Sequence, residues 1–83
     1  MMQRDRQFKV EGNWALAADN LQWVLQRKNG DAWAGVSFVR STKDILARCM
    51  REKGMEPLIA ERLLDGLPDT FEEWKSSMEG LPG

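Results

Sequence analysis

The dipeptide Asn29-Gly30 constrains the fold more than any other feature of this sequence. A two-residue type I′ turn needs positive φ at both central positions, and Asn-Gly adopts that geometry most readily. If these two residues form the turn, Lys28 lies opposite Asp31 as an opposite-charge cross-strand pair. The sequence therefore predicts a β-hairpin with Asn29-Gly30 at its tip.

A second turn is predicted at Asp19-Asn20, because both residues tolerate the left-handed region. A one-residue slip would turn a whole strand over, so the two turns test each other. Read as two-residue turns, they agree on one apolar face, which we expect to face the core. Its members are Trp14, Leu16, Ala18, Leu21, Trp23, Leu25, Ala34, Val36 and Phe38.

The opposite face of these strands is mixed and mostly small or polar, which suits a solvated or partner-binding face. It carries Gln22, Gln26 and Trp33 on the predicted register. An exposed tryptophan is typical of binding hot spots. The alternative is that Trp33 folds over Gly35 or packs under the N-terminal segment, and the sequence leaves both interpretations open.

A helix is predicted after the strands, from Thr42 to about Lys53. Ser41 is the expected N-cap, and Asp44 three residues later resembles a capping box with the shorter acid. Gly54 suits the position just past the helix end, where a left-handed backbone conformation is common.

Two shorter helices are predicted to follow. Pro57 suits the first position of one helix, and Asp69, with Glu72 three residues on, is the expected N-cap of the other. With residues 7–11 as a possible first strand, the fold class is α+β. We expect an antiparallel three- to four-stranded β-meander followed by two to three α-helices packed on one face. The first and third helices should cover it, the third through Phe71, Trp74 and Met78.

The length of 83 residues fits a single domain over 1–83, and we expect residues 1–6 and 80–83 to be flexible. No apolar run resembles a signal peptide or is long enough to cross a membrane. One cysteine cannot form an intrachain disulfide, which agrees with a reducing cytoplasm. These features predict a cytoplasmic protein.

Catalytic and cofactor motifs are missing from the sequence. It contains no histidine, a single cysteine and no glycine-rich phosphate loop. Cys49 lies four residues after Ile45 on the apolar side of the first helix, where we expect an inert packing residue. We therefore expect no enzyme activity, no cofactor and no metal.

Charge is unevenly placed along the chain. Residues 1–54 hold ten Lys/Arg and six Asp/Glu, whereas residues 55–83 hold two Lys/Arg and seven Asp/Glu. Such asymmetry suits a nucleic-acid surface at one end or an acidic, DNA-like surface at the other. The simpler explanation, which we favour, is that the two halves attract each other within one small fold.

The segment from Trp14 to Arg27, then Val36-Ser-Phe-Val with Ser41-Thr-Lys, then Leu46 with Cys49, resembles small proteins carried by bacterial phages and mobile elements. The resemblance covers roughly residues 14–75. The chain is also similar in size and in its compact α+β core to anti-CRISPR inhibitors, which share no common motif.

The resemblance implies a non-enzymatic, protein-binding module in the cytoplasm of a bacterial host. Its partner would be a CRISPR-Cas surveillance complex, blocked by steric or DNA-mimicking occlusion. A small nucleic-acid-binding accessory protein is the alternative function. The candidate contacts are Gln22, Gln26 and Trp33 on the sheet, Arg27 and Lys28 at the hairpin, and Glu72 and Glu73 on the third helix.

Overall fold

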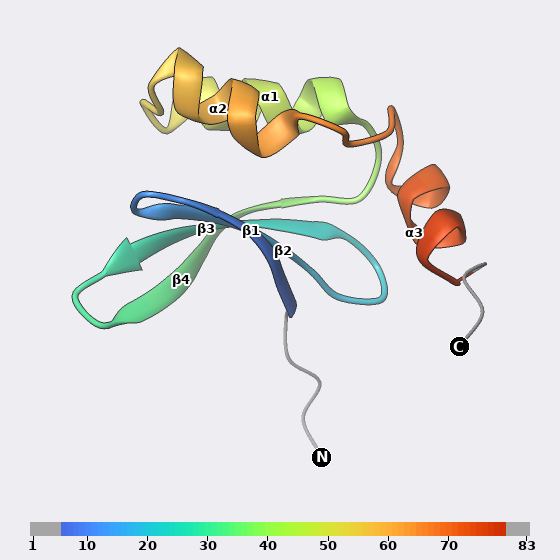
Figure 1. Ribbon diagram of the computed structural model, residues 1–83, viewed down its shortest axis with the longest axis horizontal. Helices are drawn as coiled ribbons and strands as arrows, with labels where there is room; N and C mark the ends of the chain where they lie inside the picture. Colours follow the sequence, from blue (N-terminus) through green and yellow to red (C-terminus); the bar gives the residue numbers. More distant parts are fainter. Residues whose placement is uncertain (1–5, 80–83) are drawn as a thin grey trace.

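The structure, a computed structural model, describes residues 6–79 and the side chains of residues 6–77. One antiparallel sheet of order β1-β2-β3-β4 precedes three helices, so the predicted α+β meander is confirmed (Figure 1). Residues 1–5 and 80–83, and the side chain of Met78, lie outside the described part, whereas Arg6 already belongs to β1. The elements are β1 (Arg6–Glu11), β2 (Trp14–Ala18), β3 (Trp23–Asn29), β4 (Ala32–Val39), α1 (Lys43–Glu52), α2 (Pro57–Leu64) and α3 (Phe71–Glu79).

The connection between β2 and β3 is longer than predicted. Ala18 pairs with Trp23, so the loop holds four residues instead of two. The Asp19 carboxylate organises this loop, because its Oδ1 accepts the backbone N–H groups of Leu21 at 2.7 Å and Gln22 at 3.0 Å. The predicted pairing is shifted by an even number of residues, so the apolar side chains of β2 and β3 still share one face.

The β3–β4 hairpin is present, but its turn lies one residue later than predicted. Asn29 pairs with Ala32, and Gly30 alone at the tip has positive φ, 66°. The two loop residues are therefore Gly30-Asp31, with Asn29 as the end of β3. The predicted Lys28–Asp31 pair is wrong, because Lys28 lies opposite Trp33.

A β-bulge in β4 overturns part of the predicted core face. The register shifts between Gly35 and Ser37, which leaves Val36 as an extra residue. An extra residue reverses the faces of everything beyond it. Val39 is consequently buried at 2% exposure, whereas Phe38 is 59% exposed. Three residues predicted for the core are in fact exposed, namely Leu21, Ala34 and Phe38.

The core lies between one face of the sheet and the helices. Figure 1 shows α1 and α2 above the sheet and α3 beside it. We expected the first and third helices to form this cover, and α2 contributes as well, through Leu63. Trp23 meets Phe71 of α3 edge to face, with ring centroids 5.6 Å apart. The fully buried large side chains are Leu16, Trp23, Val24, Leu25, Leu46, Met50 and Leu63.

The starts of α1 and α3 are joined by an isolated antiparallel bridge between Thr42 and Thr70. The carbonyl of Ser41 accepts the N–H of Phe71 at 2.9 Å, and the carbonyl of Asp69 accepts the N–H of Lys43 at 2.8 Å. This bridge keeps the chain extended for one more residue. The N-caps are consequently Thr42 and Thr70, so the predictions of Ser41 and Asp69 are wrong by one position.

Lys9 ties β1 to the end of α2. Its ammonium group donates to the carbonyls of Arg62 at 2.8 Å and of Asp65. Carbonyls at a helix C-terminus lack intrahelical partners and carry partial negative charge, so a cation there is stabilising. Glu11 adds a weaker tie, with its carboxylate 3.7 Å from the Arg62 guanidinium.

No helix within residues 6–79 is long and apolar enough to span a membrane.

Candidate functional site

The face of the sheet turned away from the helices, which we call the outer sheet face, carries exposed apolar side chains. Ala15, Ala17 and Val24 form its floor and are fully buried. Larger side chains lie on the strands at the two edges, where Val10 is 51% and Phe38 59% exposed. The register places Gln7, Val10, Ala15, Ala17, Val24, Gln26, Lys28, Trp33, Gly35 and Phe38 on this face.

The Phe38 ring lies over Gly35. A Cβ atom on Gly35 would lie 3.0 Å from Cζ of Phe38 and 3.1 Å from a methyl group of Val24. Glycine therefore leaves the space in which the aromatic ring covers the strand. Trp33 was one candidate to fold over Gly35, but Phe38 takes that place, and Trp33 lies half-buried opposite Lys28.

Gln26 belongs to the floor of the outer sheet face. It is 8% exposed, and its side-chain oxygen accepts from the side-chain nitrogen of Gln7 at 2.8 Å. This bond crosses the intervening strand β2, whose small Ala15 and Ala17 leave room for it. A buried amide needs a hydrogen-bond partner, and the Gln26 side chain has one within the sheet. Gln26 is therefore poorly placed to bind a ligand.

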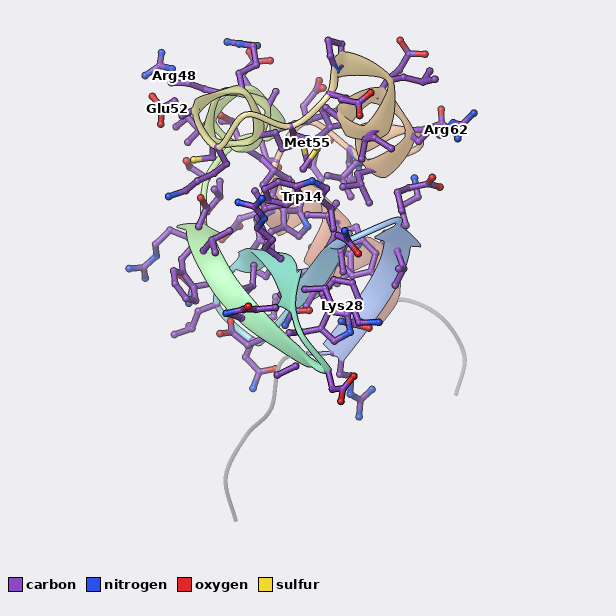
Figure 2. The ribbon with its side chains drawn as sticks, turned by 90° about the vertical axis from the view of Figure 1, so that its left-hand side faces the viewer. Trp14, Lys28, Arg48, Glu52, Met55 and Arg62 are labelled. Atoms are coloured by element: carbon purple, nitrogen blue, oxygen red, sulfur yellow. The ribbon has the colours of Figure 1, made fainter. Side chains whose placement is uncertain are left out.

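Arg27 and Lys28 do not form a joint basic patch. Successive strand residues point to opposite faces, and only Lys28 reaches the outer sheet face. The Arg27 guanidinium instead lies 5.1 Å from the ring centroid of Trp14, a cation–π contact on the helix side of the sheet. Figure 2 shows Trp14 on the side nearest Met55 and the helices, with Lys28 farther from them.

The other three predicted contacts lie at the opposite end of the strands. Gln22 is half-buried in the β2–β3 loop, where its amide donates to Asp19 at 3.3 Å. Glu72 lines a surface groove of about 360 Å³ between this loop and α3. Glu73 accepts from the Thr70 hydroxyl at 3.1 Å, which completes the cap of α3. The two glutamates therefore have separate roles.

The structure thus brings together three of the seven predicted contact residues, Gln26, Lys28 and Trp33. The predicted set omits Val10 and Phe38, the most exposed apolar residues of the outer sheet face. One signal was present for Phe38, because an isolated glycine inside a strand pattern, here Gly35, suggests a bulge. A bulge at that position would have placed Phe38 outside.

Chemistry-bearing groups are sparse in the described part of the chain. No three His, Cys, Asp or Glu side chains among these residues lie close enough to hold a metal ion. Cys49 is a half-buried free thiol packed against the core, which agrees with the packing role predicted for it. Comparison with protein families, with curated proteins and with solved structures found no match to this chain.

Proposed function

We propose that this chain is a non-enzymatic protein-binding module that contacts its partner through the outer sheet face. The observation that carries the proposal is the exposure of Phe38 and Val10 on one face of the sheet, with Trp33 half-buried opposite Lys28. Exposed apolar residues that are gathered on one face are typical of interaction sites, whereas single exposed apolar residues are ordinary on protein surfaces. Aromatic side chains are also the commonest anchors of protein interfaces.

The charge of this face favours a protein partner over a nucleic acid. Lys28 is the single charged residue assigned to the outer sheet face among residues 6–79. Binding to a phosphate backbone requires several cations, yet Lys9 is engaged by α2 and Arg27 lies over Trp14. The complementary surface on the partner is therefore apolar and close to neutral.

For the partner itself, the resemblance to phage-borne proteins leads us to a CRISPR-Cas surveillance complex in a bacterial host. Steric occlusion suits this chain better than DNA mimicry. A DNA mimic needs rows of free carboxylates, whereas Glu73 is hydrogen-bonded to Thr70 and Glu72 lies in the groove beside α3.

The test is a phage plating assay. The chain is expressed in hosts that carry defined CRISPR-Cas systems with a spacer against the infecting phage. We expect plating to be restored by the natural sequence and lost with Val10→Asp. The matched control is Leu58→Asp, since Leu58 is similarly exposed at 55% but lies on α2. Plating restored equally by Val10→Asp would remove the outer sheet face from the mechanism.

An affinity measurement with the purified complex extends this test. Trp33→Ala should weaken binding by about 2 kcal/mol or more, as expected for an aromatic anchor. No restored plating in any host, with the chain expressed and folded, would reject the CRISPR-Cas partner. The nucleic-acid alternative predicts binding to DNA or RNA that falls steeply with added salt, and no binding at low salt would eliminate it.

A further inference from the structure

The two edges of the sheet are protected to different degrees. β1 carries Arg6, Lys9 and Glu11 among its six residues, and Lys9 and Glu11 reach α2. Charged side chains and a covering helix are common protections of an edge strand. β4, the other edge, runs for eight residues from Ala32 to Val39 without a charged residue or a proline. Each edge strand has one register irregularity, so charge and the ties to α2 are what distinguish the two edges.

The main chain of β4 presents hydrogen-bonding groups away from the sheet. In two antiparallel strands, opposite residues alternate between pairs that hydrogen-bond to each other and pairs whose N–H and C=O groups point away from each other. The alternation begins with a hydrogen-bonded pair next to a two-residue loop. The N–H of Lys28 donates to the carbonyl of Asn13 at 2.8 Å, on the β2 side, which fixes the alternation. The residues of β4 that point outward are then Trp33, Gly35 and Phe38. Within residues 6–79, no bond reaches these outward groups from another element.

The bulge gives this edge an approximate internal symmetry. Trp33 and Phe38 are five residues apart and would lie on opposite faces of a regular strand. Because Val36 is an extra residue, both side chains lie on the outer sheet face and both main-chain segments point outward. A twofold axis between Gly35 and Val36 would place Trp33 of one copy opposite Phe38 of the other, with Gly35 opposite Val36 at the axis.

We propose that β4 pairs antiparallel with β4 of a second copy of this chain, which joins two four-stranded sheets into one of eight strands. A second copy suits the edge better than a foreign strand, because one contact of Trp33 with Phe38 occurs twice about the axis. Cross-strand aromatic pairs are stabilising, and no like charges meet. The formal net charge of −1 adds little repulsion between copies.

Edge pairing goes beyond the partner binding proposed above, and Val10 on β1 stays exposed on the outer sheet face of both copies. The test is the molar mass from sedimentation velocity over a roughly hundredfold range of concentration, because a dimer dissociates on dilution. We expect the natural sequence to double its mass. Phe38→Lys should remain monomeric, whereas Val10→Lys should still dimerise, since Val10 is comparably exposed but lies on β1. Circular dichroism checks that both variants are folded.

Amide hydrogen exchange measured by NMR at both ends of this range tests the geometry. Edge pairing should slow exchange at Trp33 and Phe38, which lie opposite each other across the axis, and leave it fast in the monomer. A monomer at every concentration would overturn the proposal. So would a dimer whose outward amides exchange freely, or one abolished equally by Val10→Lys, because either result indicates face-to-face packing. None of these results bears on the plating assay, so the two proposals can fail separately.

Discussion

At the scale of single residues, the side chain of Lys9 performs a task that its position in an edge strand does not suggest. Its ammonium group reaches across to the C-terminus of α2 and takes up carbonyls that the helix itself leaves unpaired. A charge that protects an edge can therefore also dock a helix. Lys43 acts similarly, because its Nζ donates to the carbonyl of Leu67 at 3.0 Å.

Replacing Lys9 should consequently destabilise the fold. We expect Lys9→Met to lower the free energy of unfolding by about 1–2 kcal/mol, since a charged donor to helix-end carbonyls is lost while the alkyl chain is kept. Urea denaturation followed by tryptophan fluorescence measures the change. Lys28→Met is the matched control, because Lys28 is exposed and far from α2. Equal stability of the two variants would contradict the docking role.

The capping threonines offer a second test at this scale. Thr42→Ala removes the hydroxyl that accepts the N–H of Ile45 at 3.3 Å, so we expect a loss of about 1 kcal/mol. Ser41→Ala should change stability by much less, because Ser41 contributes its backbone carbonyl to the bridge with Phe71. Urea denaturation of both variants decides the matter. A larger loss of stability in Ser41→Ala than in Thr42→Ala would show that Ser41, the residue predicted from the sequence, is the N-cap.

At the scale of elements, β4 decides which residues face the core. Before the bulge its faces follow the register set by the hairpin tip, and beyond it they are reversed. The strand therefore buries Val39 and displays Phe38. The same reversal exposes the Phe38 side chain and turns its main chain outward, so Phe38 enters both proposed interactions through one local irregularity.

Two substitutions test which of these neighbouring residues faces the core. Val39→Ala should lower the free energy of unfolding by about 2 kcal/mol, because it removes two buried methyl groups and leaves a cavity. Phe38→Ala removes a much larger side chain, yet should cost less than about 1 kcal/mol because most of the ring is already in water. Thermal or urea denaturation of the monomer measures both. The reverse order of effects would mean that β4 lacks the bulge.

At the scale of the whole molecule, sheet and helices share one core. Leu16 and Leu25 from the sheet meet Leu46, Met50 and Leu63 from the helices, and all five side chains are fully buried. Among residues 6–77 the uneven charge is not expressed as a network of ion pairs between the two halves, and Glu11–Arg62 is a weak exception. The acidic second half instead supplies backbone carbonyls to lysines of the first half.

Such a shared core predicts cooperative unfolding. Leu46→Ala in α1 should cost about 3 kcal/mol, as for other fully buried leucines. The transition followed by tryptophan fluorescence, which reports on the core, should coincide with the one followed by far-ultraviolet circular dichroism, which reports on helices and strands. Separate transitions in this variant would show that α1 unfolds independently of the sheet.

The sequence by itself determined the features that depend on near neighbours. Turn-forming residues located both central hairpins to within a residue or two, and the helices begin within one residue of their predicted starts. Errors in the β2–β3 loop were of even size, so Leu16, Trp23 and Leu25 were assigned correctly to the core. Trp33 was also placed correctly on the outer sheet face.

Only the tertiary structure decided the bulge, the helix caps and the role of Lys9. The bulge lets β4 bury Val39 in the core while the Phe38 ring lies over Gly35. The caps follow from a bridge between Thr42 and Thr70, which are far apart in the sequence. Each of these features depends on contacts between segments that are distant in the sequence. The alternative local conformations, such as a strand without the bulge or a helix capped one residue earlier, differ little in local conformational energy. Local residue preferences therefore cannot choose among them, and packing does.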